Sequence, residues 1–174
     1  ATLPVLDPNS GDFLSTPING KEDKQSINLT LDHQLNKHVT LSASYSHMKD
    51  KWKAKDGWTL GPESGWDPDD INTGINHLRP QNHYALNVSY ENARFYTGLL
   101  LNYYTGCSGL AFTDNRFLIL DWNANYEFAN GITAYVTVGN LTNESYETSY
   151  NSWNGLGSSA MPGRYFMVGT KYKF

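Results

Sequence analysis

Apolar and polar residues alternate with a period of two along most of this 174-residue chain, and no segment keeps a helical period over three turns. The clearest alternation begins at Leu118, where Leu118, Leu120 and Trp122 interleave with Ile119 and Asp121. This period is typical of a β-strand with one apolar and one polar face. The pattern predicts seven strands, over residues 24–35, 39–52, 83–91, 95–104, 118–128, 132–146 and 164–174.

The predicted strands are joined by alternately short and long connections. Turns of two or three residues fall at 35–37, 92–93 and 129–131, whereas long stretches cover 53–80 and 147–161. Long antiparallel strands connected in this way are typical of outer-membrane β-barrels, in which the sheet must close because lipid cannot hydrogen-bond to an open edge. We therefore predict an all-β fold, an antiparallel transmembrane β-barrel segment. A soluble sandwich with shorter strands is the alternative.

Composition narrows the class of protein further. The chain is 39% hydrophobic and only 17% charged, and no apolar run approaches the roughly 18–20 residues of a membrane-spanning helix. A formal net charge of −4 argues against nucleic acid as a partner. Cys107 is the one cysteine, so no intrachain disulfide forms. We interpret it as a small residue of a glycine-rich loop rather than as a reactive thiol.

Three segments near the C-terminus carry a family resemblance. They are Asn140–Tyr146 (N-L-T-N-E-S-Y), Met161–Arg164 (M-P-G-R) and the ending Tyr172-Lys173-Phe174. In this order they resemble the C-terminal end of a TonB-dependent outer-membrane receptor of the siderophore, cobalamin and haem receptor family. The resemblance implies a 22-stranded barrel that encloses an N-terminal plug domain. We expect this chain to be the C-terminal portion, with residues 1–23 in an extracellular loop and residues 24–174 forming about seven strands, their periplasmic turns and extracellular loops.

Seven strands cannot close an antiparallel up-and-down barrel, so we expect the chain to be a fragment that lacks the plug. Its expected partners are the plug and the preceding strands, TonB acting through the plug, and outer-membrane lipid. The implied function is TonB-energised uptake of a ferric siderophore, or of cobalamin or haem, across the bacterial outer membrane, with no cofactor. A passive or structural barrel of the porin or adhesin kind is the alternative.

Candidate ligand contacts lie in and beside the long stretch 53–80. Trp58 and Trp66 are placed to stack on a bulky ligand, although packing of the loop on itself explains them equally well. His77 and His83 flank the end of that stretch and are further candidates for contact with the ligand.

The same stretch contains a weak calcium candidate. Asp67, Asp69 and Asp70 offer the oxygen ligands that Ca²⁺ takes, but the full spacing of a helix-loop-helix site is absent. A barrel hydrolase would require Asp and His pairs at the rim, and His47 with Asp50 is the nearest match. No serine stands in a nucleophile-elbow context, so we expect no enzyme.

Overall fold

The structure is a computed structural model in which every described element is a β-strand. It describes residues 2–6, 10, 13–17, 20–54, 59–60, 79–109, 111–152 and 155–173. Within these ranges no helix is long and apolar enough to cross a membrane. The strands are β1 (Thr2–Leu6), β2 (Phe13–Pro17), β3 (Gly20–Gln34), β4 (Val39–Ala54), β5 (Thr59–Leu60), β6 (Asn82–Glu91), β7 (Phe95–Thr105), β8 (Arg116–Glu127), β9 (Ile132–Gly139), β10 (Glu147–Ser152), β11 (Gly155–Ala160) and β12 (Tyr165–Tyr172).

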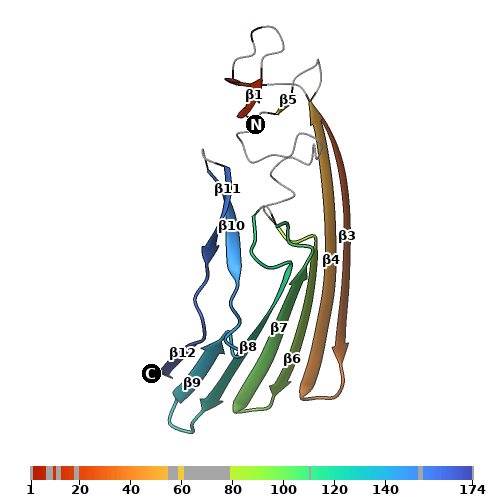
Figure 1. The fold of residues 1–174 in the computed structure, drawn as a ribbon. Helices are drawn as coiled ribbons and strands as arrows, with labels where there is room; N and C mark the ends of the chain where they lie inside the picture. Colours follow the sequence, from red (N-terminus) through yellow and green to blue (C-terminus); the bar gives the residue numbers. More distant parts are fainter. Residues whose placement is uncertain are drawn as a thin grey trace.

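Seven of these strands form one antiparallel sheet in the order β12-β9-β8-β7-β6-β4-β3. Figure 1 shows them side by side in a curved sheet, with the short turns gathered at one end and the hairpin β10–β11 extending from the other. The seven antiparallel strands predicted from the alternation are confirmed. Among the described strands the sheet is open, and β3 and β12 are its two edges.

The strand expected over 132–146 is too long, because β9 ends at Gly139. Asn140 and Asn143 follow with φ of 49° and 57°, and this left-handed conformation ends the strand. The stretch 147–161 contains the hairpin β10–β11, which the alternation did not predict because its residues are mostly small or polar. The segment before residue 24 likewise contains strands, with β1 paired to β2 and to β5.

An asparagine side chain builds each short turn. Asn36 Oδ1 accepts hydrogen bonds from the backbone N–H groups at His38 and Val39, at 2.8 and 3.1 Å. Asn92 Oδ1 accepts in the same way at the β6–β7 turn, at 3.0 and 2.9 Å. In the β8–β9 turn Asn130 Oδ1 accepts from the next strand, and Gly131 adopts φ of 78°. Asparagine suits these positions because its short side chain replaces a backbone acceptor in a tight turn.

One face of the seven-stranded sheet is apolar, and we call it the apolar face. Register places its side chains in rows that cross the strands, such as Leu41, Val88, Leu99 and Trp122. The described part of the chain leaves these side chains uncovered: Val168 is 76% exposed, and many others are more than one third exposed. The exposed members on this face include Ile27, Leu29, Leu31, Tyr84, Leu86, Val88, Leu99, Tyr126, Phe166, Val168 and Tyr172.

Aromatic residues gather at both ends of the apolar face. Tyr45, Tyr84 and Tyr103 lie in one row near the long connections, with ring centroids 4.8 and 6.0 Å apart between neighbours. Near the short turns, contacting ring pairs recur: Tyr90 with Phe95, and Tyr126 with Phe128. We call these two groups the upper and lower aromatic bands. The rows between them are mostly aliphatic, with Trp122 in the row of Leu99.

The opposite, polar face contains most of the few buried side chains of the described residues. Phe112, Phe117, Cys107 and Ala111 form a small cluster near the long connections, against which Tyr104, Ile119 and Tyr146 pack. Among the described residues the sheet therefore has no extended core, and its largest apolar surface is exposed.

Candidate functional site

A row of stacked rings crosses the polar face at its loop end. His83 on β6 lies over Tyr104 on β7, with centroids 4.3 Å apart and planes 2° from parallel. Tyr104 stacks on Phe117 of β8 at 4.8 Å, and Phe117 stacks on Tyr146 at 5.7 Å. Tyr146 lies between β9 and β10, so the row joins three neighbouring strands of the sheet to the segment that follows β9. Each ring holds its neighbour in place, since each stack is at ordinary aromatic distance.

The loop between β7 and β8 folds back over this row. Its hydrogen bonds run from the N–H groups of Ala111 and Phe112 to Ser108 O and from Cys107 N–H to Asn115 O, all within 2.9–3.0 Å. This geometry buries Phe112 beside Phe117, with centroids 6.5 Å apart.

Cys107 lies in the same loop. Burial raises the pKa of its thiol to about 11, because the apolar surroundings penalise the thiolate. A mostly protonated thiol agrees with the interpretation of Cys107 as a loop residue.

Glu147, at the start of β10, ties the hairpin β10–β11 to this loop. One carboxylate oxygen accepts from Thr113 N–H and the other from Thr113 Oγ1, both at 2.8 Å. These two bonds, the backbone one first, lower the pKa of Glu147, since they stabilise its charged form. The carboxylate therefore stays ionised at neutral pH and holds the hairpin next to the loop.

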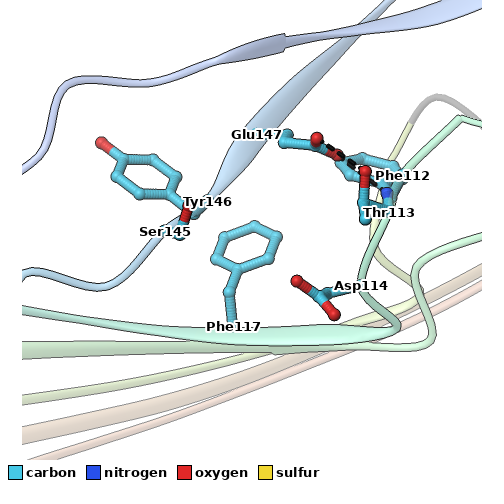
Figure 2. Close-up of a pocket in the computed structure, with 7 residues that line it drawn as sticks. All are labelled: Phe112, Thr113, Asp114, Phe117, Ser145, Tyr146 and Glu147. Carbon is cyan, nitrogen blue, oxygen red and sulfur yellow. Dashed lines mark hydrogen bonds between the residues drawn. The ribbon is translucent and has the colours of Figure 1, made fainter.

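Together these segments enclose a small pocket (Figure 2). Phe112, Phe117 and Tyr146 supply rings, and Figure 2 shows Phe117 in the middle of the group with the Tyr146 hydroxyl pointing away from it. Carboxylates and hydroxyls supply the rest of the lining, and the cavity volume is about 80 Å³. We call this the aromatic pocket; its lining residues are Phe112, Thr113, Asp114, Phe117, Ser145, Tyr146 and Glu147.

Asn140 links β8, β9 and the approach to β12. Its side chain is 2% exposed and bonds to both backbone groups of Glu144, at 2.8 Å each, while its own N–H donates to Asp121 Oδ1 at 2.8 Å. Asn143 Oδ1 accepts from Arg164 N–H at 2.9 Å, and a Cβ on Gly163 would lie 2.8 Å from that oxygen. Two of the three segments of the family resemblance, 140–146 and 161–164, therefore contact each other directly.

Most of the predicted ligand contacts cannot be located. Trp58, Trp66 and His77 lie outside the described residues, as do the calcium candidates Asp67, Asp69 and Asp70. Of the predicted contacts, His83 is described. It points to the polar face, where its Nε2 lies 2.8 Å from Asn102 Oδ1.

His47, the histidine of the candidate hydrolytic pair, contacts Asn82. His47 Nδ1 lies 2.8 Å from Asn82 Oδ1, an oxygen that also accepts from the Tyr45 hydroxyl at 2.9 Å. The side chain of Asp50 is outside the described part of the structure. The described residues contain no cluster of three or more His, Cys, Asp or Glu side chains suited to a metal ion.

Sequence reasoning missed the aromatic pocket. A signal was present, because Tyr104, Phe117 and Ile119 are apolar residues at positions where the alternation assigns them to the polar face. Such exceptions mark places where the polar face is covered. The contribution of Glu147 carried no such signal, since its partner Thr113 lies 34 residues away in sequence.

No protein-family model, curated protein or solved structure matches this chain.

Proposed function

We propose that this chain is part of the wall of a bacterial outer-membrane β-barrel, the C-terminal portion of a TonB-dependent receptor. The uncovered apolar face is the observation that carries the proposal. Phe166 and Leu29 are 69% and 60% exposed within a continuous apolar surface of seven strands. Monomeric soluble proteins rarely leave such a surface open, whereas lipid covers it at no cost in hydrogen bonds.

The spacing of the aromatic bands supports a bilayer as the cover. Eight residues separate Phe95 from Tyr103 on β7, which is about 26 Å along the strand at ~3.3 Å per residue. Outer-membrane barrels have an apolar band about 25 Å tall, flanked by aromatic residues at both interfaces. Strand tilt shortens the projected distance, and the rings themselves extend it. A second sheet packed on this face would not require two aromatic bands.

The two sheet edges support further strands as partners. An unpaired edge exposes backbone groups that lipid cannot satisfy, at several kcal/mol for each group. In the proposed barrel β3 and β12 pair with strands that the described residues do not supply, and the plug fills the space next to the polar face. The contact between segments 140–146 and 161–164 supports the family assignment, because it gives both resemblance motifs one structural role.

The proposed cargo is a ferric siderophore, with cobalamin and haem as further members of the same class of bulky nutrients. β4 ends and β6 begins at the same end of the sheet, and the stretch 53–80 with Trp58 and Trp66 connects these two strands in the sequence. In this proposal that end is extracellular, the loops capture the ligand, and TonB drives the plug to release it. The chain contributes wall and loops rather than catalysis.

Energy-dependent uptake tests this function. Cells that produce the whole receptor are given radioiron-labelled siderophores, labelled cobalamin or haem, with and without a protonophore that collapses the inner-membrane potential. The proposal predicts saturable uptake of one of these ligands that is lost with the protonophore. Uptake that rises linearly with ligand concentration and ignores the protonophore would identify a passive barrel and contradict the proposal.

Loop variants refine the test. Replacing Trp58 and Trp66 by alanine should raise the ligand concentration for half-maximal uptake by about threefold to tenfold, if each ring stacks on the ligand. Tyr126→Ala removes a ring from the lower aromatic band and should leave that concentration unchanged, at equal receptor levels in the membrane. An unchanged concentration in the tryptophan variant would assign these rings to loop packing.

A further inference from the structure

We propose that the aromatic pocket binds a small organic cation, an alkylammonium group, at the loop end of the polar face. The inference goes beyond the proposed uptake of an iron chelate, because it rests on the pocket alone. Its three supports are the rings of the floor, the charges at the rim and the size of the cavity.

The floor of the pocket consists of ring surface shielded from water. Phe112 and Phe117 are 6% and 8% exposed. Phe117 is stacked between Tyr104 and Tyr146, so the rings that can present a face to a ligand are Phe112 and Tyr146. A cation over an aromatic face is attracted by the ring quadrupole, and the attraction grows when water is excluded. The Tyr146 hydroxyl points away from the group, so Tyr146 offers its ring rather than a hydrogen-bond donor (Figure 2).

The rim carries negative charge and no positive charge. Asp114 and Glu147 are the two ionisable acids among the seven lining residues, and none of the seven is Lys, Arg or His. Thr113 donates two hydrogen bonds to the Glu147 carboxylate and the Ser158 side chain donates a further one, which leaves about one of the roughly four lone-pair sites of that carboxylate for a cation. An anion would meet repulsion here, and a neutral ligand would gain nothing from the two charges.

Size and chemistry select among cations. A cavity of about 80 Å³ leaves room for a head group of a few heavy atoms. Ca²⁺ prefers six or more oxygen ligands, whereas three of the seven lining residues here are rings. The lining therefore suits an organic cation better than Ca²⁺. An alkylammonium group satisfies both parts of the lining, since its alkyl surface contacts rings while its charge faces carboxylates.

Calorimetric titration with a charged ligand and its neutral isostere tests the proposal. Choline and 3,3-dimethyl-1-butanol have the same shape, but carbon replaces the charged nitrogen in the alcohol. Titrated into the purified whole receptor in detergent, choline should bind about tenfold or more tightly than the alcohol. Equal affinities, no choline binding, or displacement of choline by millimolar Ca²⁺ would each overturn the proposal.

Two isosteric variants identify the site. Asp114→Asn removes one rim charge and should weaken choline binding by about threefold to tenfold, whereas Asp32→Asn on β3 should leave it unchanged. Equal effects of both variants would refute this location. Uptake of the iron chelate by the unmodified receptor does not depend on choline binding, so either proposal can fail while the other stands.

Discussion

Leu99 and Leu100 are adjacent on β7, point to opposite faces, and are almost equally exposed in the described chain, at 39% and 38%. The proposed membrane placement predicts that arginine is costly at one and tolerated at the other. Leu99 lies four residues from Phe95 and four from Tyr103, hence midway between the aromatic bands. Arginine on the lipid face costs about 2–4 kcal/mol at the bilayer midplane. Leu100 faces the polar side, where the same change should cost about 0–1 kcal/mol.

The predicted loss in the free energy of unfolding determines how large the measured effect should be. A loss of about 2–4 kcal/mol lowers the folding equilibrium constant about 30-fold to about 700-fold, since about 1.4 kcal/mol corresponds to a factor of ten. Urea titration of the whole receptor in phospholipid vesicles, followed by resistance to protease, measures the free energy of unfolding for L99R and L100R. The amount of folded protein in the outer membrane of cells gives a second readout, and L99R should be strongly depleted there.

The comparison is matched, because both variants lose a leucine of similar exposure and gain the same charge. Equal effects at the two positions would refute the membrane placement of the apolar face. A larger loss for L100R would mean that the polar face, rather than the apolar face, lies against an apolar partner.

The loop end offers three further predictions. Asn140→Ala should destabilise the protein by about 3 kcal/mol in a urea titration, from two buried bonds to Glu144 and a left-handed backbone, and Asn140→Gly should recover the part of that loss that comes from the backbone. Cys107 should react with maleimide at pH 8 about 100-fold more slowly in the folded protein than in urea, because its pKa is raised to about 11; equal rates would contradict its burial. The pKa of Glu147 is lowered, so its bond to Thr113 is fully present above the unfolded value near 4.5 and is lost as pH falls through the lower pKa of the folded protein. Distances between spin labels on the loop and the hairpin should stay constant from pH 8 to 5 and broaden once the pH falls through the lowered pKa of Glu147, and E147Q should abolish that change.

The sheet could be predicted from sequence because its strands obey a local rule. A period-two pattern over ten or more residues specifies a strand and its two faces, and the short turns carry asparagine where the backbone requires an acceptor. The hairpin β10–β11 could not be predicted in this way. Its residues are mostly polar or small, and what places it next to the loop is the bond between Glu147 and Thr113.

The end of β9 and the aromatic pocket depend on contacts between distant segments. The alternation does not distinguish Asn140 from the asparagines within the strands, and its structural role follows from Glu144, Asp121 and the later segment near Pro162. The pocket likewise forms only when the β7–β8 loop meets the start of β10. Apolar residues on the polar face, such as Phe117, were its one trace in the sequence.

The central claim is that the apolar face of the seven-stranded sheet lies against lipid. Cys107 of the receptor is replaced by alanine, and single spin labels are placed along β7, from Phe95 to Thr105. In vesicles these labels report collision with oxygen in lipid and with a nickel chelate in water. The account predicts a period of two, with lipid accessibility highest at residue 99 and high at the odd positions 97 and 101. It predicts that the even positions 98, 100 and 102 are shielded from lipid. Contact with the nickel chelate at residue 99 and no alternation along β7 would contradict it.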